Sequence, residues 1–333
     1  MKNGNLVFSN ARVKSLESSL ITEEKMTRMI HAANLEEGVK ILYECGYAGG
    51  TTLERAEDYP ALLEEELKRV TAFFRETMIS SSGMDAFLLE EDYLSAKIFM
   101  KKKYMRDASD SGDLPPEGNI SHDTLKECIF NDNYSSLPKF IAEALHLIDE
   151  LFANGRRSPR YIDTYLDKAM YKDIHARISK GKNKTIIEYF KAKTDLTNIA
   201  TALRVKKIGN ASLLKDNYIE GGSYSLGFLE SLIEESNDSI AERLKYSDYR
   251  DIAEASFGDY AKSGSLVRFE AMSESYLMKI FRRDKGDIFS VAPIIGFFVA
   301  KRTEIRTARL ILTALKNNVG RDAVKERLRE FYV

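Results

Sequence analysis

A nine-residue pattern that occurs three times limits what this chain can fold into. An acid is followed by an apolar residue, any residue, a small polar residue and an apolar residue, and another apolar residue comes four positions later. The copies are Asp92–Met100, Asp195–Leu203 and Glu304–Leu312, which begin 103 and 109 residues apart. Self-similarity at a nearly fixed period indicates a body built from stacked, similar units. We therefore expect three diverged helical units.

A second landmark follows the first two copies. It is a glycine three positions before a serine, with a leucine four positions further on, in Gly118–Leu125 and in Gly222–Leu229. The third copy lacks this landmark and runs almost directly into residues 321–328. The segment Asp107–Asn119, with two prolines and two glycines, reads as a loop between units. These signals predict one compact body divided into helical repeats at residues 1–117, 118–221 and 222–333.

The third copy lies inside Ile288–Leu328, the densest apolar stretch of the sequence. Pro293 interrupts this stretch early and Lys301 and Arg302 close it, so it is too short and too charged to span a bilayer. From Arg302 onward the spacing predicts an amphipathic helix. Its apolar side carries Ile305, Ala308, Leu312 and Leu315, and another side carries a basic stripe of Arg302, Arg306, Arg309 and Lys316.

Composition and local signals favour helices throughout. Charged residues make up 30% of the 333 residues, prolines number only 6, and strand alternation is scarce, so the sequence predicts an all-α fold. Thr22, followed by two glutamates, and Asn34, with Glu37 three residues later, read as helix starts. The formal net charge of −1 provides no global field for nucleic acid or an anionic membrane.

Cysteine usage and the N-terminal residues bear on the compartment. The two cysteines, Cys45 and Cys128, make no disulfide framework, which favours a reducing compartment. The first fifteen residues contain no apolar stretch of signal-peptide length. We expect a protein that is soluble or peripheral, on the cytoplasmic side.

Each copy of the pattern places an acid and a small polar residue three positions apart, on one helix face. Such pairs could hold a metal or relay protons, but no histidine or cysteine lies near enough in sequence to strengthen that interpretation. We interpret them as buried polar groups that fix how neighbouring helices pack, with nearby basic residues as donors. The pairs are Asp92 with Ser95, Asp195 with Asn198, and Glu304 with Thr307.

No recognisable catalytic motif occurs. The four histidines are far apart in sequence, and neither a phosphate-binding loop, a dinucleotide fingerprint nor a nucleophile elbow is present. We expect a protein with no active site, cofactor or metal of its own. The basic stripe is the feature most open to a functional role: it is either a solvated face, a docking face for an acidic partner, or a row of ion pairs between repeats. Nucleic-acid binding is disfavoured because the stripe contains no interleaved aromatic residues.

Three stretches together resemble one family over nearly the whole chain. They are the N-terminal FSNARVKSLE, the Asp195-x-x-Asn198 core followed by a glycine pair, and the C-terminal APIIGFFVAKRTEIRTARLIL. The sequence resembles the C subunits of the vacuolar/archaeal-type (V-type/A-type) rotary ATPases, whose eukaryotic counterpart is the d subunit. The matching positions are Arg12, Pro293, Gly296, Lys301, Glu304, Arg306 and Arg309. Phe297-Phe298 and Ser95 depart from the usual pattern, in which a tyrosine-containing pair and an asparagine are common.

The resemblance implies a funnel-shaped, all-helical body of three similar parts that performs no bond chemistry. It implies a central-stalk subunit, peripheral on the cytoplasmic face, that couples the rotating shaft of subunits D and F to the membrane ring of proteolipid (c/K) subunits during ATP-driven ion transport or ion-driven ATP synthesis. Under this interpretation Arg12, Arg302, Arg306, Arg309 and Lys316 brace the socket or form its interface.

Two other classes of function stay open from the residues alone. The repeats could form an adaptor for an unrelated protein partner, which would not associate with a membrane ring. Alternatively, the acids of the three copies could converge at a pseudo-threefold centre and form an enzyme site, which would bind a metal or small ligand and lose it when the acids became amides.

Overall fold

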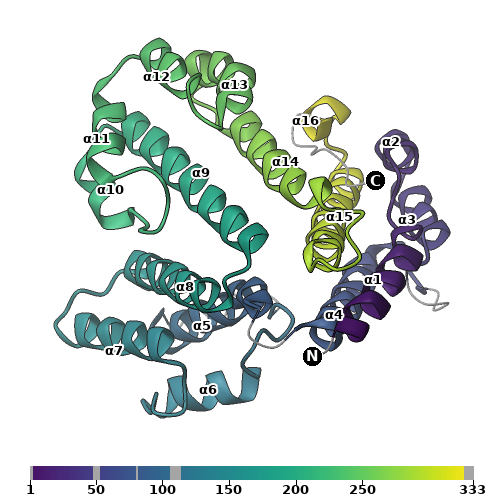
Figure 1. The fold of residues 1–333 in the computed structure, drawn as a ribbon, viewed down its shortest axis with the longest axis horizontal. Helices are drawn as coiled ribbons and strands as arrows, with labels where there is room; N and C mark the ends of the chain where they lie inside the picture. Colours follow the sequence, from purple (N-terminus) through teal and green to yellow (C-terminus); the bar gives the residue numbers. More distant parts are fainter. Residues whose placement is uncertain (1–2, 48–52, 80–81, 106–113, 326–333) are drawn as a thin grey trace. The chain divides into compact units, whose positions relative to one another are not determined.

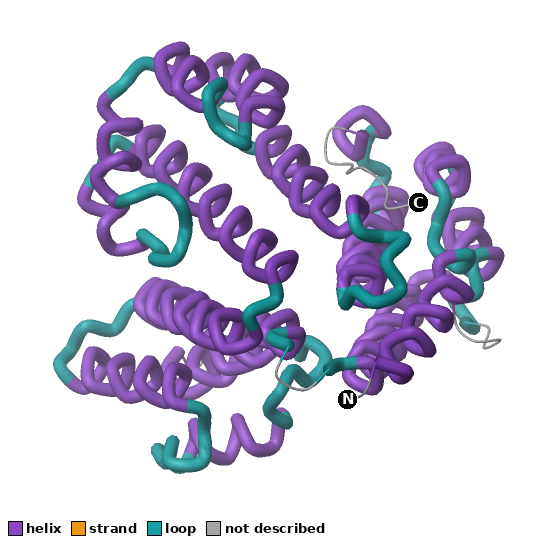
Figure 2. Tube along the Cα trace, viewed as in Figure 1, coloured by secondary structure: helices purple, strands orange, loops and turns teal. Residues whose placement is uncertain are grey.

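The computed structural model describes residues 3–47, 53–79, 82–105 and 114–325. Within these ranges every regular element is a helix and no strand occurs, so the predicted all-α class is confirmed (Figure 2). None of the described helices combines the length and the apolar character needed to cross a bilayer. Most of the predicted loop Asp107–Asn119 lies outside the described residues, and the part from residue 114 onward is not helical.

The chain folds into two compact units. Unit 1 consists of residues 1–78 and 236–333, and unit 2 of residues 79–235. Unit 2 is therefore continuous in sequence, whereas unit 1 is assembled from the two ends of the chain. The division into three repeats stays a prediction.

Unit 2 is built around two long helices. The helix α8 (Pro159–Gly181) packs against α5 (Leu89–Met105) on one side and α7 (Lys139–Ala153) on another, and α9 (Lys184–Ile208) follows it (Figure 1). Shorter helices cover these: α6 (His122–Phe130) packs on α5, and α11 (Leu226–Glu234) and α10 (Ser212–Asn217) pack on α9. The 3-10 helix η3 (Met84–Leu88) leads into α5. Leu145, Leu166 and Ile174 are among the fully buried core residues of unit 2.

Unit 1 is organised around α15 (Ala292–Lys316). This helix packs against α4 (Tyr59–Thr77), α14 (Val267–Arg283), α1 (Asn3–Glu17), α3 (Leu35–Glu44) and α2 (Glu23–His31). The remaining elements are η2 (Ala56–Asp58), α12 (Asn237–Leu244), α13 (Arg250–Ser263) and α16 (Arg321–Lys325). The Phe297-Phe298 pair anchors α15 to α4, since Phe298 stacks on Phe74 at 4.0 Å and Phe297 meets Phe73 edge-on at 6.0 Å.

The long helix α15 corrects one expectation. The helix that was expected from Arg302 onward begins at Ala292, with Pro293 in its first turn, and runs without a break to Lys316. Proline is tolerated in the first turn, where its missing N–H has no helical acceptor. Ile288 and Phe289 stay in the preceding loop and are 43% and 67% exposed. The predicted apolar side is confirmed for Ile305, Ala308 and Leu312, which are at most 3% exposed.

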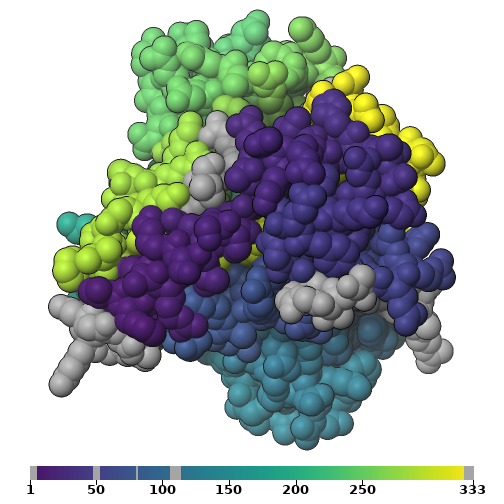
Figure 3. Space-filling model, turned by 90° about the vertical axis from the view of Figure 1, so that its right-hand side faces the viewer, coloured from purple at the N-terminus to yellow at the C-terminus, as the bar shows by residue number. Residues whose placement is uncertain are grey.

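Local capping explains where the N-terminal helices begin. The Thr22 hydroxyl accepts a hydrogen bond from the Lys25 N–H at 3.3 Å, and Asn34 Oδ1 accepts one from the Glu37 N–H at 2.9 Å. Both predicted helix starts are therefore confirmed. The helix α2 lies beside α16 on the surface of unit 1, where Arg321 donates to the carbonyl oxygen of His31 at 3.2 Å (Figure 3).

Candidate functional site: buried carboxylates and a basic helix face

The Asp92 carboxylate holds the loop that follows α5. Asp92 lies in the first turn of α5 and is 1% exposed. Its oxygens accept hydrogen bonds from the backbone N–H groups of Asn119 and Ile120 at 3.0 and 2.9 Å, and from the Asn119 side-chain amide at 3.0 Å. Burial raises the pKa of Asp92, and these three hydrogen bonds oppose the shift. The donors are loop amides rather than the basic side chains expected from the sequence.

Asp195 has the same relationship with a second loop. It is fully buried in α9 and accepts hydrogen bonds from the N–H groups of Ser223 and Tyr224 at 2.5 and 3.4 Å. Its companion Asn198 both donates to the carbonyl oxygen of Ile219 at 2.8 Å and accepts from its N–H at 3.0 Å. This acid and amide together fix the segment between α10 and α11 against α9.

The third acid, Glu304, binds a loop near the start of the chain. Glu304 lies in α15 and accepts a hydrogen bond from the Ile21 N–H at 2.5 Å. In all three cases the acid accepts a hydrogen bond from the N–H of the residue just before a helix N-cap. The donors are Ile120, Tyr224 and Ile21, and the N-caps that follow them are Ser121, Ser225 and Thr22. The landmark that is missing after the third copy is thus matched in position by Ser19–Thr22.

The small polar companions of the first and third acids do not share this loop-holding role. Ser95 is 1% exposed, and its hydroxyl has no hydrogen-bond partner among the described residues. Thr307 donates its hydroxyl hydrogen to the carbonyl oxygen of Thr303 at 2.9 Å, within its own helix.

Glu304 also belongs to a buried ion network that sequence reasoning missed. The Lys301 ammonium, 1% exposed, lies 2.6 Å from Glu304 Oε1 and 3.1 Å from Glu66 Oε1. Tyr47 donates its hydroxyl hydrogen to Glu304 at 2.6 Å, and the Lys301 ammonium lies 4.4 Å from the centre of the Tyr47 ring. Burial next to these carboxylates raises the pKa of Tyr47 well above its ordinary value. Arg69 pairs with Glu66 at 2.7 Å and completes the network.

One signal in the sequence points to part of this network. Lys301 and Glu304 lie three residues apart within the apolar part of α15, and a buried charge requires a partner of opposite sign. Tyr47 and Glu66 are far from Glu304 in sequence, and no sequence pattern marks them as members of the network. The carboxylates of this network accept hydrogen bonds and form ion pairs within the protein. The network joins the N-terminal segment to α4 and α15.

The predicted basic stripe lies on the outer side of α15. Arg306 and Arg309 are exposed, Lys316 is exposed in the last turn, and Arg302 is half-buried. The Arg302 guanidinium lies 5.3 Å from the centre of the Phe298 ring, and Arg306 lies 3.7 Å from Glu274 of α14. With a side chain that is 57% exposed, Arg306 retains a charge that a partner can reach.

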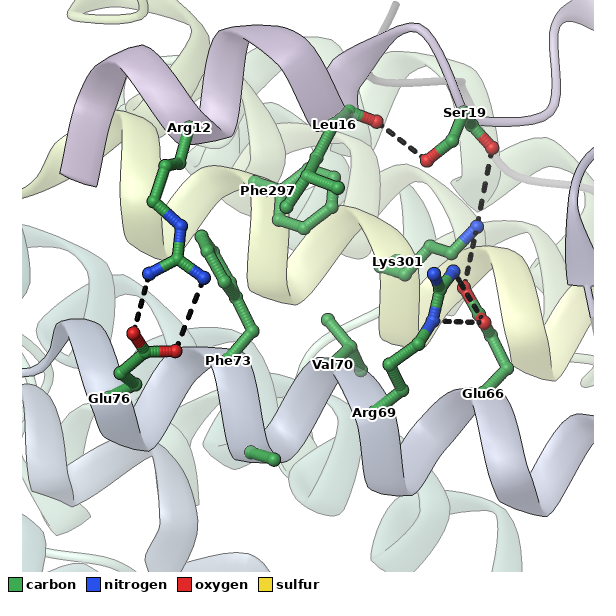
Figure 4. A pocket seen from close by; sticks show the side chains of 11 residues that line it. Arg12, Leu16, Ser19, Glu66, Arg69, Val70, Phe73, Glu76, Phe297 and Lys301 are labelled. Atoms are coloured by element: carbon green, nitrogen blue, oxygen red, sulfur yellow. Dashed lines mark hydrogen bonds and ion pairs between the residues drawn. The ribbon is translucent and has the colours of Figure 1, made fainter. Parts of the chain in front are cut away.

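Arg12 lies apart from this stripe, at the edge of a pocket between α1, α4 and α15 (Figure 4). Its guanidinium pairs with Glu76 at 2.7 Å and lies 4.9 Å from the centre of the Phe73 ring. Among the described residues, no group of three or more histidine, cysteine, aspartate or glutamate side chains is arranged to hold a metal ion.

Comparison with known proteins identifies the family. The profile of the family described as ATP synthase (C/AC39) subunit matches residues 9–327. The C subunit of the A-type ATP synthase of Methanocaldococcus jannaschii is 23% identical, with 96% of this chain and 85% of that protein covered. The C subunit of the V-type sodium ATPase of Enterococcus hirae is 20% identical, with 97% and 98% covered. The C subunit of the A-type ATP synthase of Thermococcus kodakarensis is 24% identical, with 96% and 89% covered.

The family match covers nearly the whole chain and includes all three buried acids and both loops that follow the first two. The loop Ser19–Thr22, which meets the third acid, also lies within the matched residues. The chain therefore belongs to the ATP synthase (C/AC39) subunit family, whose members are the C subunits of A-type and V-type ATPases and are structural rather than catalytic.

Proposed function

We propose that this protein is a central-stalk subunit of a V/A-type rotary ATPase. It couples the rotating shaft, formed by subunits D and F, to the membrane ring of proteolipid (c/K) subunits. Coupling serves either ATP-driven ion transport or ion-driven ATP synthesis. The subunit is peripheral, on the cytoplasmic face of the membrane, and its body is a funnel of three helical repeats.

The observation that carries this proposal is the buried ion network around Lys301. A coupling subunit has to pass force between its helices without letting them slide. Removing one partner from a buried ion pair costs about 3–5 kcal/mol, because the other charge is left without compensation. Sliding of α4 along α15 by a helical turn would separate Glu66 from Lys301, which are 3.1 Å apart. The network therefore resists shear between these helices.

The held loops give a second line of support. Asp92, Asp195 and Glu304 each bind the loop that leads into a different helix from the one that carries the acid. A body whose connections are fixed in this way deforms less under load than one whose loops are free. The names of the relatives, an A-type ATP synthase and a V-type sodium ATPase, fit operation in either direction.

The basic residues of α15 serve the interface in this proposal. Arg302, Arg306, Arg309 and Lys316 meet an acidic partner or brace the socket that receives the shaft. Arginine suits this role because its planar guanidinium binds carboxylates through two parallel hydrogen bonds.

Co-purification tests the proposal. A tagged chain is expressed in its source cell, the membranes are solubilised in mild detergent, and the recovered proteins are identified by mass spectrometry. The proposal expects the shaft subunits together with the proteolipid ring. Recovery of soluble partners alone, with no ring, would exclude the coupling role and favour a helical-repeat adaptor for another protein.

A further inference from the structure

A pocket in unit 1 has no role in the proposal above. It has a volume of about 350 Å³ and lies between α1, α4 and α15 (Figure 4). A volume of this size accommodates a large side chain with room for its neighbours. The buried ion network forms one end of the pocket, and Arg12 with Glu76 forms the other.

The middle of the pocket is apolar. Leu16 from α1, Val70 and Phe73 from α4, and Phe297 from α15 line it. The edge-on contact between Phe73 and Phe297, at 6.0 Å, fixes the two rings in the wall. An apolar side chain that enters here leaves water without displacing any internal hydrogen bond.

The two ends differ in the charge that they present. At one end Arg69 is 53% exposed, whereas its partner Glu66 is 2% exposed, so this end offers a cation to solvent. The two hydrogen bonds from Arg69 to Glu66 use Nε and one Nη, which leaves further N–H donors of the guanidinium for a second carboxylate. At the other end Arg12 is 36% exposed and Glu76 is 62% exposed, so the more exposed member of that pair is the carboxylate.

The surface next to Arg12, outside the pocket itself, has the composition of a protein interface. Phe8, one turn before Arg12 on α1, is 61% exposed and lies 5.9 Å from the Arg12 guanidinium. Exposed aromatic and arginine side chains around an apolar pocket are the groups that contribute most to binding between proteins. Arg69 and Phe73 lie four residues apart on α4, so they are neighbours on one face of this helix.

We infer that this pocket binds an acidic amphipathic helix of a neighbouring subunit. An apolar side chain of that helix enters the pocket and packs against the wall that Phe73 and Phe297 form, and a carboxylate about one turn away pairs with the exposed guanidinium of Arg69. Charge complementarity selects the carboxylate, and the apolar walls select its neighbour. This inference rests on the proposed function, since it takes the partner from the same complex.

Two matched substitutions on α4 test the inference. Ala72 is exposed and lines the pocket, whereas Ala61 is exposed on the same helix and does not line it. In Ala72→Glu a carboxylate at the entrance repels the acidic helix and fills its space, so the partner's affinity falls about tenfold or more. Ala61→Glu makes the same chemical change outside the pocket and leaves the affinity at the wild-type value. Both full-length variants are compared in the detergent-solubilised complex.

The outcomes separate this inference from the proposed function. If the wild-type chain recovers neither shaft nor ring, the proposed function fails. If the wild type recovers both, and Ala72→Glu retains every subunit as firmly as Ala61→Glu does, the pocket is not a docking site. Unfolding midpoints of the two purified variants show whether either change disturbs the fold.

Cross-linking gives a second measurement that does not depend on affinity. A photoreactive amino acid at position 72, in the assembled complex, is expected to link to a helix of another subunit in which an acid lies within one turn of an apolar residue. Links confined to this chain or to a second copy of it, or links to a segment without carboxylates, would overturn the inference.

Discussion

The carboxylate of Asp92 occupies the space that a side chain on Gly118 would need. A Cβ atom at Gly118 would lie 2.3 Å from Asp92 Oδ1 and 2.5 Å from the carbonyl oxygen of Leu88. The same holds for Gly222, whose Cβ would lie 2.3 Å from Asp195 Oδ1. Each glycine is required because the loop has to approach the buried acid closely.

We expect Gly118→Ala to destabilise unit 2 by about 2–4 kcal/mol, since the methyl group pushes the loop away and costs Asp92 its donors. Urea unfolding of the purified chain measures this. Gly227→Ala in α11 is the control, because a Cβ there meets no atom within 4 Å and a helical alanine is favoured by up to about 1 kcal/mol. Equal stability of the two variants would contradict the close-approach argument.

The third acid is a glutamate where the first two are aspartates, and its loop has Ser19 at the position of the glycine. The longer side chain lets Glu304 reach the Ile21 N–H at 2.5 Å although Ser19 has a Cβ. Glu304→Asp should therefore cost about 1–3 kcal/mol. Adding Ser19→Gly should return at least about 0.5 kcal/mol in a double-mutant cycle of unfolding free energies. A coupling energy of zero would show that the two positions are independent.

Lys301→Met should remove about 3–5 kcal/mol from unit 1, because Glu66 and Glu304 then share a buried site with no ammonium between them. Hydrogen exchange read by mass spectrometry should show lost protection in peptides from α4 and α15. Lys316→Met removes an exposed lysine from the same helix and should change stability by less than about 0.5 kcal/mol. If α4 and α15 keep their protection in the Lys301 variant, the ion network does not hold these two helices together.

Unit 2 should lose stability in mildly acidic solution. His175 lies in α8 with Nε2 3.1 Å from the Thr194 hydroxyl, and burial lowers the pKa of His175 below its ordinary value of 6.5. The unfolded chain binds a proton more readily than the folded one, so this contribution is present above pH 6.5 and is lost as the pH falls through the lower folded pKa. Unfolding midpoints between about pH 7.5 and about pH 5 measure the effect, and His175→Gln should flatten the profile.

The basic stripe of α15 should matter for assembly and not for folding. Arg306→Glu combined with Arg309→Glu disrupts one half-exposed ion pair, at 3.7 Å from Glu274, which is worth at most about 1 kcal/mol. We expect reduced recovery of partner subunits with a nearly unchanged unfolding midpoint. Charge reversal at Lys245 and Lys262, two exposed cations elsewhere in unit 1, is the control. Intact assembly of the Arg306/Arg309 variant would remove this face from the proposed interface.

What the sequence predicted well depends on short-range interactions. Helix starts at Thr22 and Asn34 follow from side chains that reach amides three residues away. The apolar side of α15 follows from helical spacing. The start of α15, at Ala292, lies before the predicted start at Arg302, because a proline within an apolar run does not show by itself whether a helix begins or ends beside it.

The partners of the buried acids were out of reach for a different reason. Tyr47 and Ile21 meet Glu304 across 257 and 283 residues of chain. No local pattern records a contact of this range, and, apart from the Asn119 side chain, the donors to Asp92 and Asp195 named above are backbone amides, which every residue but proline has. The sequence could therefore mark the acids as buried and polar, but it could not name what they hold.

The contact between Ile21 and Glu304 also sets a timetable for biosynthesis. Translation at about 5–20 residues per second leaves roughly 15–60 s between the appearance of Ile21 and that of Glu304. Residues 79–235 form a unit of their own and emerge complete within this interval. The N-terminal helices α2 and α3, by contrast, are synthesised long before α15, the helix against which both of them pack.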